Sequence, residues 1–235
     1  MITVIPMAGE GSRFRAAGYE LPKPFIDVLG KPMISRVIES LPKSDKTIFI
    51  CRKQHLEEYP WFASALLGLT ESAEIVTVDH LTEGAACTVL LAEHLINNDE
   101  ELIIANSDQE VIFDHMMFDS LRRADQDGII FLFTANHPKW SYAQIQSGKI
   151  VHVAEKTVIS HNATCGIYYF KRGADYVGAA NNMIRKNQRT NGEFYNAPVY
   201  NELINVRMEI MPFFVKQMYG LGTPEDLTIY KEIHG

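Results

Sequence analysis

Glycine and cationic residues are concentrated in residues 4–25, directly after a short apolar run. Gly9 and Gly11 would let backbone N–H groups approach phosphate oxygens, because no Cβ stands in the way. Arg13 and Lys23 add side chains that form charge-assisted hydrogen bonds with phosphates. A proline on each side of Lys23 predicts a rigid, extended backbone that aims its side chain. These residue types in this order indicate a site for a small polyanion such as a triphosphate.

Single positions exclude two familiar phosphate-binding motifs. The dinucleotide fingerprint needs a third glycine where this chain has Phe14. A Walker loop needs Ser or Thr after Gly-Lys, whereas Gly30 and Lys31 are followed by Pro32. A glycine-rich turn between a strand and a helix is also common as a purely structural feature. The function of the segment therefore depends on what accompanies it in the chain.

Charge is spread unevenly along the 235 residues. The formal net charge is −7 at pH 7, yet residues 1–53 hold nine Lys and Arg against five acidic residues. A groove that tracks a nucleic-acid backbone needs a clustered excess of cations, so we expect no nucleic-acid partner. A local cationic zone on an acidic chain suits a nucleoside triphosphate better than a long polyanion.

The cysteines and the first residues of the sequence favour a reducing compartment. Cys51, Cys87 and Cys165 lie far apart, without a Cys-x-x-Cys pair or a histidine spacing typical of zinc. The first residues lack the charged region and the cleavage site of a signal peptide. The sequence has no apolar run of about 20 residues, the length that spans a bilayer. We therefore expect a cytoplasmic protein with reduced thiols and no membrane partner.

Strand and helix patterns alternate through the first part of the chain. The predicted strands are apolar throughout and helices separate them, which favours a parallel sheet covered on both faces. The expected strands are 3–7, 46–51, 73–78, 101–106 and 128–135, and the expected helices are 33–41, 55–69 with a break near Pro60, 84–96 and 118–125.

The pattern changes after Asn136. Residues 141–156 predict a hairpin that turns at Ser147 and Gly148, and further strands are expected at 163–170 and within 208–219. Helices are expected at 174–186, at 197–204 and after Pro224. No internal repeat, low-complexity stretch or linker divides the sequence. We therefore expect one α/β domain over residues 1–235 whose second half adds antiparallel elements.

"AGEGSRF" is followed by "PKPF", and further motifs follow in order along the chain. The first two segments resemble the Gly-x-Gly-Thr-Arg segment and later Pro-Lys of the nucleotidyltransferases that couple a nucleoside triphosphate to a sugar phosphate. "TEGAACTVLLA" is similar to its base-binding loop and "IIANSDQ" to its metal-binding acid at a strand end. "VAEK", "ATCGIYYF" and "LGTPEDL" resemble its acceptor-side elements and closing motif.

This resemblance covers most of the chain and implies its fold. The family fold is a single-domain, Rossmann-like, three-layer α/β/α structure of the GT-A type, with a mixed, mostly parallel sheet. Residues of about 1–135 would form the nucleotide-binding part, and residues of about 136–235 the acceptor-binding part. The short length resembles the smaller members of the family, including cytidylyltransferases such as those that use phosphocholine.

The resemblance also implies a reaction. The acceptor's phosphate oxygen would attack the α-phosphorus of the triphosphate, and pyrophosphate would leave. Arg13 would face the pyrophosphate, Lys23 the α-phosphate and Lys156 the acceptor phosphate, while Asp108 would ligate Mg²⁺. Arg13, Lys23 and Asp108 are thus the implied catalytic residues. The implied nucleotide-binding residues are Ala8, Gly9, Gly11, Ser12, Arg13, Lys23, Gly84, Ala85 and Asp108, and the implied acceptor-binding residues are Gln109, Glu155, Lys156, Gly166, Glu193 and Tyr195.

Some of these positions have structural interpretations as well. Asp108 could cap the helix that follows it, and Glu155 could form a strand-end ion pair with Lys156. Asn196, beside Tyr195, could line the acceptor pocket or cap a helix. Trp140 could stack on an acceptor or pack against the protein. We leave these alternatives open at the level of sequence.

Two positions depart from the family pattern. Gly220 stands where many relatives carry a second metal-binding Asp, so Mg²⁺ would be held by Asp108, phosphates and water, or by another carboxylate. Asp226 and Glu225 are close in sequence but are expected to open the last helix. The glutamine that reads thymine or uracil in many relatives would lie near Asp79, which leaves the base open among CTP, UTP, dTTP and GTP.

We therefore expect a Mg²⁺-dependent nucleotidyltransferase that uses an NTP, with CTP, UTP or dTTP as the expected donors. The acceptor is a sugar 1-phosphate or a non-sugar such as phosphocholine or a phosphorylated amino acid. A glycosyltransferase of the same fold is an alternative, although such enzymes show Asp-x-Asp where this chain has "SDQ". A nucleotide-binding protein without catalysis is another, motivated by Gly220. A role in surface polysaccharide or glycoconjugate assembly rests on the resemblance alone, and the oligomeric state is left open.

Overall fold

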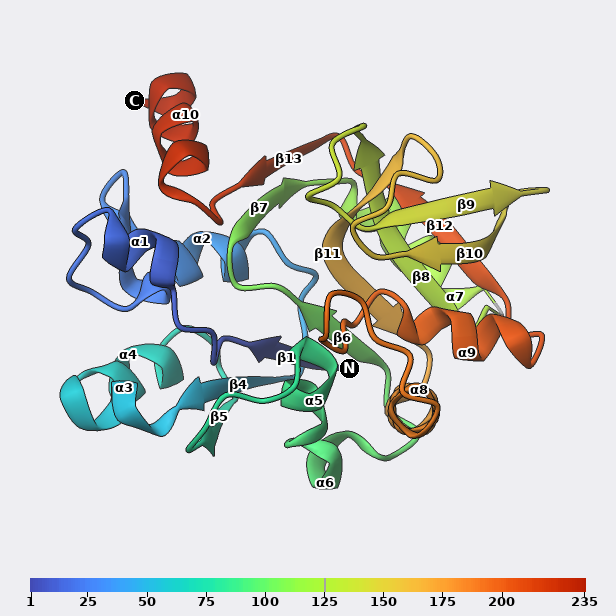
Figure 1. Ribbon diagram of the computed structural model, residues 1–235, viewed down its shortest axis with the longest axis horizontal. Helices are drawn as coiled ribbons and strands as arrows, with labels where there is room; N and C mark the ends of the chain where they lie inside the picture. Colours follow the sequence, from blue (N-terminus) through green and yellow to red (C-terminus); the bar gives the residue numbers. More distant parts are fainter. Residues whose placement is uncertain (125) are drawn as a thin grey trace.

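A nine-stranded mixed sheet forms the centre of the computed structural model, which describes residues 1–124 and 126–235 (Figure 1). Its main path runs β10 (Lys149–Ala154), β9 (Tyr142–Gln146), β11 (Asn162–Phe170), β6 (Leu102–Ala105), β1 (Ile2–Pro6), β4 (Lys46–Arg52) and β5 (Ala73–Val78). β8 (Gly128–Thr134) pairs with β11 and with β12 (Ile210–Phe214). The central strands β6, β1, β4 and β5 are parallel, whereas β11 is antiparallel to β6, β8 and β9. The expected mixed sheet with antiparallel additions in the second half is confirmed.

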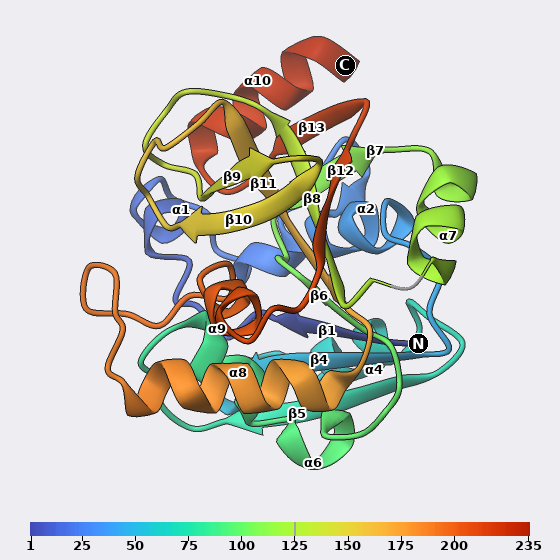
Figure 2. The same cartoon turned by 90° about the vertical axis from the view of Figure 1, so that its right-hand side faces the viewer.

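Helices cover both faces of this sheet, as apolar strands require. In β4, Ile48 and Ile50 join one buried cluster while Phe49 and Cys51 join another on the opposite face. The first cluster includes side chains of α5 (Ala85–Leu90), α6 (Glu93–Ile96), α8 (Gly173–Arg185) and α9 (Val199–Asn205). The second includes side chains of α2 (Met33–Glu39), α4 (Phe62–Leu67) and α7 (His115–Arg123). Figure 2 shows α8 and α9 on one side of the strands and α2 and α7 on the other, so the three-layer α/β/α arrangement is confirmed.

A third buried cluster attaches the last helix to the beginning of the chain. It joins Phe14 of α1 (Ser12–Ala16), Met33 of α2, and Leu227 and Tyr230 of α10 (Pro224–His234). The α10 helix begins after Thr223, whose side chain accepts a hydrogen bond from the Asp226 N–H at 3.1 Å. The expected opening of this helix by acidic residues is confirmed, and the packing places the helix against α1 and α2.

Several element boundaries differ from the sequence expectations. Residues 84–96 form two helices, α5 and α6, instead of one. Residues 208–219 form β12 and a separate strand, β13 (Gln217–Gly220), which pairs with β7 (Gln109–Ile112). The break near Pro60 separates α3 (Lys53–Glu58) from α4, as expected. The α7 helix begins at His115, and Asp125, the last residue of the helix expected there, lies outside the described residues. The remaining elements are the 3₁₀ helix η1 (Lys23–Phe25) and the small hairpin of β2 (Asp27–Val28) and β3 (Lys31–Pro32).

The predicted hairpin is the one formed by β9 and β10. Ser147 and Gly148, at its turn, have positive φ angles of 50° and 78°, which is typical of the two-residue turns that suit the twist of a hairpin. None of the helices in the described part of the chain has the length and apolar character that crossing a membrane requires.

Candidate active site

The glycine-rich loop leads from the end of β1 into α1. Gly11 is the N-cap of α1 and has a φ of 61°, a left-handed conformation that glycine adopts without strain. A Cβ at Gly11 would lie 3.3 Å from Lys23 Cβ, so the absence of a side chain also lets η1 pack over the loop. Lys23 begins η1 between Pro22 and Pro24. The structure thus explains why glycines and a proline-flanked lysine occur together: they bring Lys23 onto the loop.

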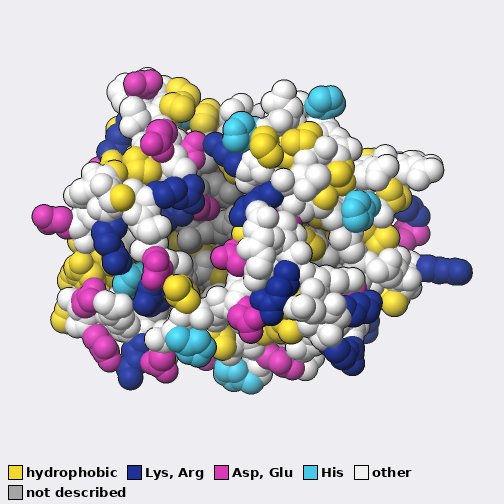
Figure 3. Space-filling model, in the orientation of Figure 1, with side chains coloured by type: hydrophobic (Ala, Val, Ile, Leu, Met, Phe, Trp, Pro, Cys, Tyr) yellow, Lys and Arg dark blue, Asp and Glu magenta, His cyan; other side chains and the backbone are white. Residues whose placement is uncertain are grey.

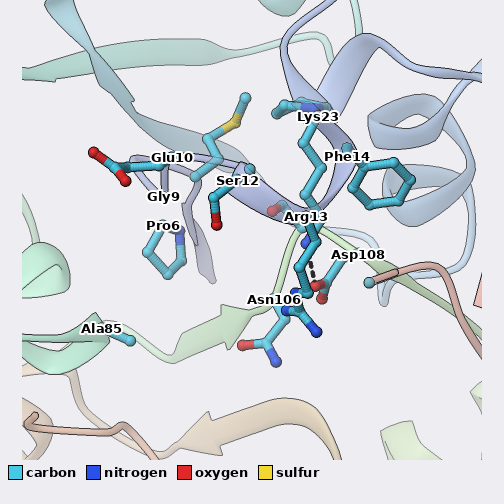
Figure 4. A pocket seen from close by; sticks show the side chains of 15 residues that line it. Pro6, Gly9, Glu10, Ser12, Arg13, Phe14, Lys23, Ala85, Asn106 and Asp108 are labelled. Carbon is cyan, nitrogen blue, oxygen red and sulfur yellow. Dashed lines mark hydrogen bonds and ion pairs between the residues drawn. The ribbon is translucent and has the colours of Figure 1, made fainter. Parts of the chain in front are cut away.

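A cavity of about 340 Å³ opens between this loop and the end of β6 (Figure 4). The predicted nucleotide-binding residues that line it are Gly9, Gly11, Ser12, Arg13, Lys23, Ala85 and Asp108. Ala8 and Gly84 are not among its lining residues. Asn106 and Ser107, which precede Asp108, do line it. The polar run after β6 therefore faces a cavity, and its polarity was the signal for this in the sequence.

Lys23 and Asp108 meet inside this cavity. Lys23 Nζ lies 2.5 Å from Asp108 Oδ2, and both side chains are largely buried. The backbone oxygen of Asp108 accepts a hydrogen bond from the Leu221 N–H at 2.8 Å, which fixes the segment before α10 beside it. The suggestion that Asp108 caps the next helix is wrong, because Asp114 is the N-cap of α7 and accepts from the Met117 N–H at 3.1 Å.

A second cavity of about 340 Å³ continues from the first. Arg13, Ala85, Asn106, Asp108 and Gly222 line both. The predicted acceptor-binding residues that line the second cavity are Gln109, Glu155, Lys156, Gly166 and Tyr195. Figure 3 shows a hollow in the middle of this face, with Lys and Arg side chains on both sides of it. Residues that the sequence analysis assigned to two substrates therefore line one continuous groove.

Glu193 lies apart from this groove. Its side chain is exposed and is not among those lining either cavity. Its carboxylate interacts with the Tyr195 hydroxyl and, after burial, is the main cause that raises the pKa of Tyr195. Glu193 therefore reaches the groove through Tyr195, which itself lines the second cavity.

Glu155 and Lys156 each have a partner of their own. Ser141 Oγ donates a hydrogen bond to Glu155 Oε2. Burial raises the pKa of Glu155, while the Ser141 hydrogen bond and the Lys156 charge act in the opposite direction. Lys156 has a positive φ of 53°, and its Nζ lies 2.5 Å from Tyr195 Oη and 4.5 Å from the centroid of that ring. A left-handed non-glycine residue is a strained conformation of the kind that clusters at functional sites.

Gly166 lets two amide side chains reach the floor of the second cavity. It has a φ of 71° and lies where the register of β11 against β8 shifts. A Cβ at this position would lie 2.1 Å from Gln109 Nε2 and 2.4 Å from Asn106 Nδ2. The space that another residue's side chain would fill is therefore occupied by these amides, which line the groove.

The loop before α5 is tied to the acceptor side of the molecule. Phe194 N–H donates to Glu83 O at 2.8 Å, and Ala86 N–H donates to Phe194 O at 3.0 Å. Gly84 has a φ of 132°, and a Cβ there would lie 2.4 Å from Phe194 O. The structure thus explains why position 84 is a glycine, which the sequence analysis missed: the absence of a side chain lets the backbone of Phe194 approach. Asn196 is not a helix cap, because α9 has Pro198 at its N-cap and Asn196 Oδ1 accepts from Tyr176 Oη at 2.9 Å.

Lys139, Trp140 and Asp226 also line the second cavity. Lys139 and Asp226 were not assigned to a substrate from the sequence, and they are 87 residues apart. The aromatic character of Trp140 was a signal that the sequence analysis noted. Nothing in the sequence spacing links Lys139 to Asp226, so only the fold could bring them together.

The carboxylates of the groove fit a hard cation that brings its own phosphate ligands. Asp108 lines both cavities, and Asp226 lines the second. Among residues 1–124 and 126–235, no group of three or more His, Cys, Asp or Glu residues could hold a metal. Mg²⁺ is commonly held by one or two carboxylates together with substrate phosphates and waters. The donor set is therefore compatible with Mg²⁺ that enters with a triphosphate.

Comparison with sequences of known proteins supports this interpretation. Residues 2–204 match the family model described as "Nucleotidyl transferase". The chain is 28% identical over 185 residues to mannose-1-phosphate guanyltransferase beta-B from Xenopus laevis, a match that covers 72% of this chain and 49% of that protein. The beta-A form from the same organism matches equally well over 185 residues. The chain thus spans about half the length of these curated relatives.

Solved structures extend the comparison to almost the whole chain. A nucleoside-diphosphate-sugar pyrophosphorylase from Vibrio cholerae RC9 is 27% identical with a TM-score of 0.83, covering 99% of this chain and 100% of that one. A UDP-glucose pyrophosphorylase in complex with UDP-glucose is 18% identical with a TM-score of 0.77, over 99% and 97% of the two chains, a likeness of fold. Because the family model matches most of the sequence, the chain belongs to the nucleotidyl transferase family, as the resemblance predicts.

Proposed function

We propose that this protein transfers a nucleoside monophosphate from a nucleoside triphosphate to a sugar phosphate and releases pyrophosphate. The observation that carries the proposal is that two contiguous cavities share Arg13 and Asp108. A triphosphate in the first cavity and a phosphorylated acceptor in the second would meet at these two side chains. Membership of the nucleotidyl transferase family supports the same reaction.

In this reaction the nucleotide side of the groove stabilises charge. Gly9 and Gly11 leave the loop N–H groups accessible to phosphate oxygens. Arg13 binds the departing pyrophosphate, and Lys23 binds the α-phosphate as its charge grows, since preorganised cations act where charge develops. The acceptor phosphate is already ionised at neutral pH, so the chain needs no general base. Lys156 holds that phosphate in line with the α-phosphorus.

We propose Mg²⁺ as the cofactor, held on the protein side by Asp108. Mg²⁺ held there would supply positive charge that neutralises part of the charge of the phosphates. Asp226, whose carboxylate lies near Gly220, is another carboxylate that lines the groove. The carboxylate of Asp108 also orients Lys23 by its ion pair, which keeps that cation inside the cavity.

In the proposed division into a nucleotide half and an acceptor half, each half also contributes residues to the other half's cavity. Residues of about 1–135 supply most of the first cavity, but Gly222 lines it too. Residues of about 136–235 supply most of the second cavity, but Gln109 lines it too. We therefore propose that the two parts differ in which substrate they mainly contact and that both belong to one domain.

Glu155 favours a sugar phosphate over phosphocholine as the acceptor. Its buried carboxylate lines the acceptor cavity and offers a hydrogen-bond acceptor for the hydroxyl groups that a sugar carries. The sugar-related names of the relatives agree with this choice.

The base of the donor triphosphate is left open, so all the candidate triphosphates have to be tested. The sequence favours CTP, UTP or dTTP, and the name guanyltransferase of the curated relatives adds GTP. The cysteine pattern favours the cytoplasm as the place of the reaction. On the resemblance alone, we propose that the reaction is a step of surface polysaccharide or glycoconjugate assembly.

Pyrophosphate release is the measurement that tests the proposed function. The protein is incubated with CTP, UTP, dTTP, GTP or ATP against sugar 1-phosphates, phosphocholine and phosphoamino acids, each with Mg²⁺ and with EDTA. We expect release with Mg²⁺ for a sugar phosphate and none with EDTA. Lys23→Ala should abolish the signal, and Lys43→Ala, at an exposed site, should keep it. Triphosphate binding without release for any acceptor would contradict the proposal and favour a binding protein.

A further inference from the structure

Lys139 is a cation of the acceptor cavity to which the reaction described above gives no role. It lies between β8 and β9, and its side chain is one of those that line the second cavity. Lys139 Nζ lies 3.0 Å from Asp226 Oδ1 in the first turn of α10, and 4.7 Å from the centroid of the Trp140 ring. The three side chains form a cluster at one side of the groove, which we call the Lys139 cluster.

Gly220 lies against the Lys139 cluster. A Cβ at Gly220 would lie 3.5 Å from the Trp140 ring and 3.6 Å from Asp226 Oδ2, which are ordinary contact distances. The ring and the carboxylate therefore both lie beside the backbone at this position.

Lys156 has a matching arrangement from another element of the same cavity. Its Nζ lies 2.5 Å from the hydroxyl of Tyr195 and 4.5 Å from the centroid of that ring, whereas Lys139 Nζ lies 4.7 Å from the centroid of the Trp140 ring. The cavity therefore receives two lysines that each lie beside an aromatic side chain. Lys156 has a neutral partner, whereas Lys139 is held by a carboxylate.

The ion pair of Lys139 is of a kind that an anion can displace. The side chain of Lys139 is 44% exposed, and exposed ion pairs contribute little to stability. Asp226 has a second source of stabilisation, because it lies in the first turn of α10 where the helix dipole favours negative charge. A phosphate dianion offers Lys139 more charge than one carboxylate does. Exchange of Asp226 for a phosphate therefore costs the protein little.

We propose that Lys139 is a second phosphate-binding side chain of the acceptor cavity, and that Asp226 holds it until a phosphate displaces the carboxylate. The identity of that phosphate as the acceptor's own rests on the proposed function. The contact itself requires only that an anion enters the second cavity. Lys139 and Lys156 would then bind the acceptor phosphate from different elements, and Asp226 acts as a positioning residue.

Trp140 provides a reporter that does not depend on catalysis. The sequence contains two tryptophans, so Trp61→Phe leaves Trp140 as the single one. In this background, inorganic phosphate is titrated at constant ionic strength against a sodium chloride control. We expect a saturable change in Trp140 fluorescence, because Lys139 moves off the ring. Phosphate that binds without changing Trp140 fluorescence overturns the proposal.

Variants of the pair give the sharper test, because their effects have opposite signs. Lys139→Met should weaken phosphate binding about tenfold. Asp226→Asn should tighten it severalfold, since the competing carboxylate is gone, and this gain should vanish in the Lys139→Met/Asp226→Asn double variant. A merely structural ion pair predicts no tightening by Asp226→Asn. If Asp226→Asn tightens phosphate binding equally with Lys139 and with Lys139→Met, the effect is a general electrostatic one and the proposal is overturned.

Two controls separate charge from folding. Lys149→Met removes a lysine of the β9–β10 hairpin that pairs with Glu209, and phosphate binding should not change. Lys139→Arg keeps the charge and should retain most of the binding, whether or not Lys139→Met is fully folded. Loss of binding in Lys139→Arg equal to that in Lys139→Met, with an unchanged melting temperature, would contradict a phosphate contact.

Kinetics distinguish this inference from the proposed function. If the pyrophosphate assay finds an acceptor, Lys139→Met should raise the KM for that acceptor about tenfold and leave the KM for the triphosphate unchanged. Transfer with an unaltered acceptor KM overturns the Lys139 inference alone. A silent assay together with an intact phosphate cycle supports the Lys139 contact and removes the proposed function.

Discussion

Lys23 Nζ lies 2.5 Å from Asp108 Oδ2, although the two residues are 85 positions apart in the sequence. The pair joins the proline-flanked η1 to the loop after β6, and it lies inside the first cavity. Each partner satisfies the other while no substrate is bound. In the proposed reaction a triphosphate would supply phosphate oxygens for Lys23, and the metal bound with it would take the place of Lys23 at Asp108.

Removal of Lys23 tests this relationship. Lys23→Ala should lower the rate of transfer by roughly 10²-fold or more, because a preorganised cation no longer meets the developing charge. Arg13→Ala should have an effect of the same order. The rate is measured as pyrophosphate release in single turnovers, so that product release does not mask the chemical step.

The matched control for these variants is Lys43→Ala, which removes a lysine of the same N-terminal cationic region at an exposed position. Its rate should equal that of the unmodified protein. Unchanged turnover in both Lys23→Ala and Arg13→Ala would remove these residues from the catalytic assignment.

The carboxylate of Asp108 lies close to the backbone of Gly222. A Cβ at Gly222 would lie 2.9 Å from Asp108 Oδ2, closer than real contacts allow. Gly222→Ala should therefore displace the carboxylate and weaken Mg²⁺ binding roughly 10- to 100-fold, as loss of a ligand's support does at other metal sites. Mn²⁺ binding in the presence of a triphosphate, followed by electron paramagnetic resonance, measures this directly.

Gly220→Ala, in the same segment, is the comparison variant for Gly222→Ala. Its Cβ would meet Trp140 and Asp226 at 3.5 and 3.6 Å, which are ordinary contact distances. Mn²⁺ affinity should stay within about twofold of the unmodified protein. Equal losses in the two variants would mean that the approach to Asp108 is not what matters.

The central sheet could be predicted from the sequence because burial on both faces makes each strand apolar throughout. In β4, residues such as Ile48, Phe49 and Ile50 are all apolar because alternate side chains enter opposite clusters. The glycine-rich loop and the polar run at Asp108 were visible for a similar reason, since a strand end followed by such residues indicates a ligand site. These features depend on near neighbours in the chain.

Other parts of the groove depend on contacts that no local pattern records. The short strands β7 and β13 pair across about a hundred residues, and Lys139 meets Asp226 across 87. Gly84 was assigned to a base, but the structure places the backbone of Phe194 against it. The resemblance implied Glu193 and Tyr195 as acceptor-binding residues, and of these two only Tyr195 lines the cavity. In each case, tertiary packing decides what a residue contacts.

The contact between Gly84 and Phe194 predicts a large loss of stability. A Cβ at Gly84 would lie 2.4 to 2.9 Å from the Phe194 backbone, and the φ of 132° strains any other residue. Gly84→Ala should lower the free energy of unfolding by roughly 3 kcal/mol or more. Urea denaturation followed by circular dichroism provides the measurement.

Gly178→Ala is the same chemical change as Gly84→Ala, but it should change the free energy of unfolding in the opposite direction. Gly178 is exposed inside α8, and a Cβ there meets nothing within 4 Å. Alanine at such a position should raise the free energy of unfolding by about 0.5–1 kcal/mol. If Gly84→Ala were as stable as the unmodified protein, the close approach of the two loops would be disproved.

The buried carboxylate of Glu155 predicts how stability changes with pH. Burial raises the pKa of Glu155 above its ordinary value of 4.5 in the folded protein. Between the unfolded and folded pKa values, the folded state keeps a proton that the unfolded state has lost. The free energy of unfolding therefore contains a contribution that is fully present below about 4.5 and is lost as pH rises through the folded pKa.

Glu155→Gln removes this contribution because an amide does not titrate. The difference in free energy of unfolding, Glu155→Gln minus the unmodified protein, should increase as pH rises from about 4.5 through the folded pKa of Glu155. Above the folded pKa this difference should be constant. Urea denaturation at several pH values between 4.5 and 8 measures the difference. Glu209→Gln, which replaces an exposed carboxylate, serves as the comparison variant. A difference for Glu155→Gln that stays flat or falls with rising pH would mean that burial does not penalise the Glu155 carboxylate.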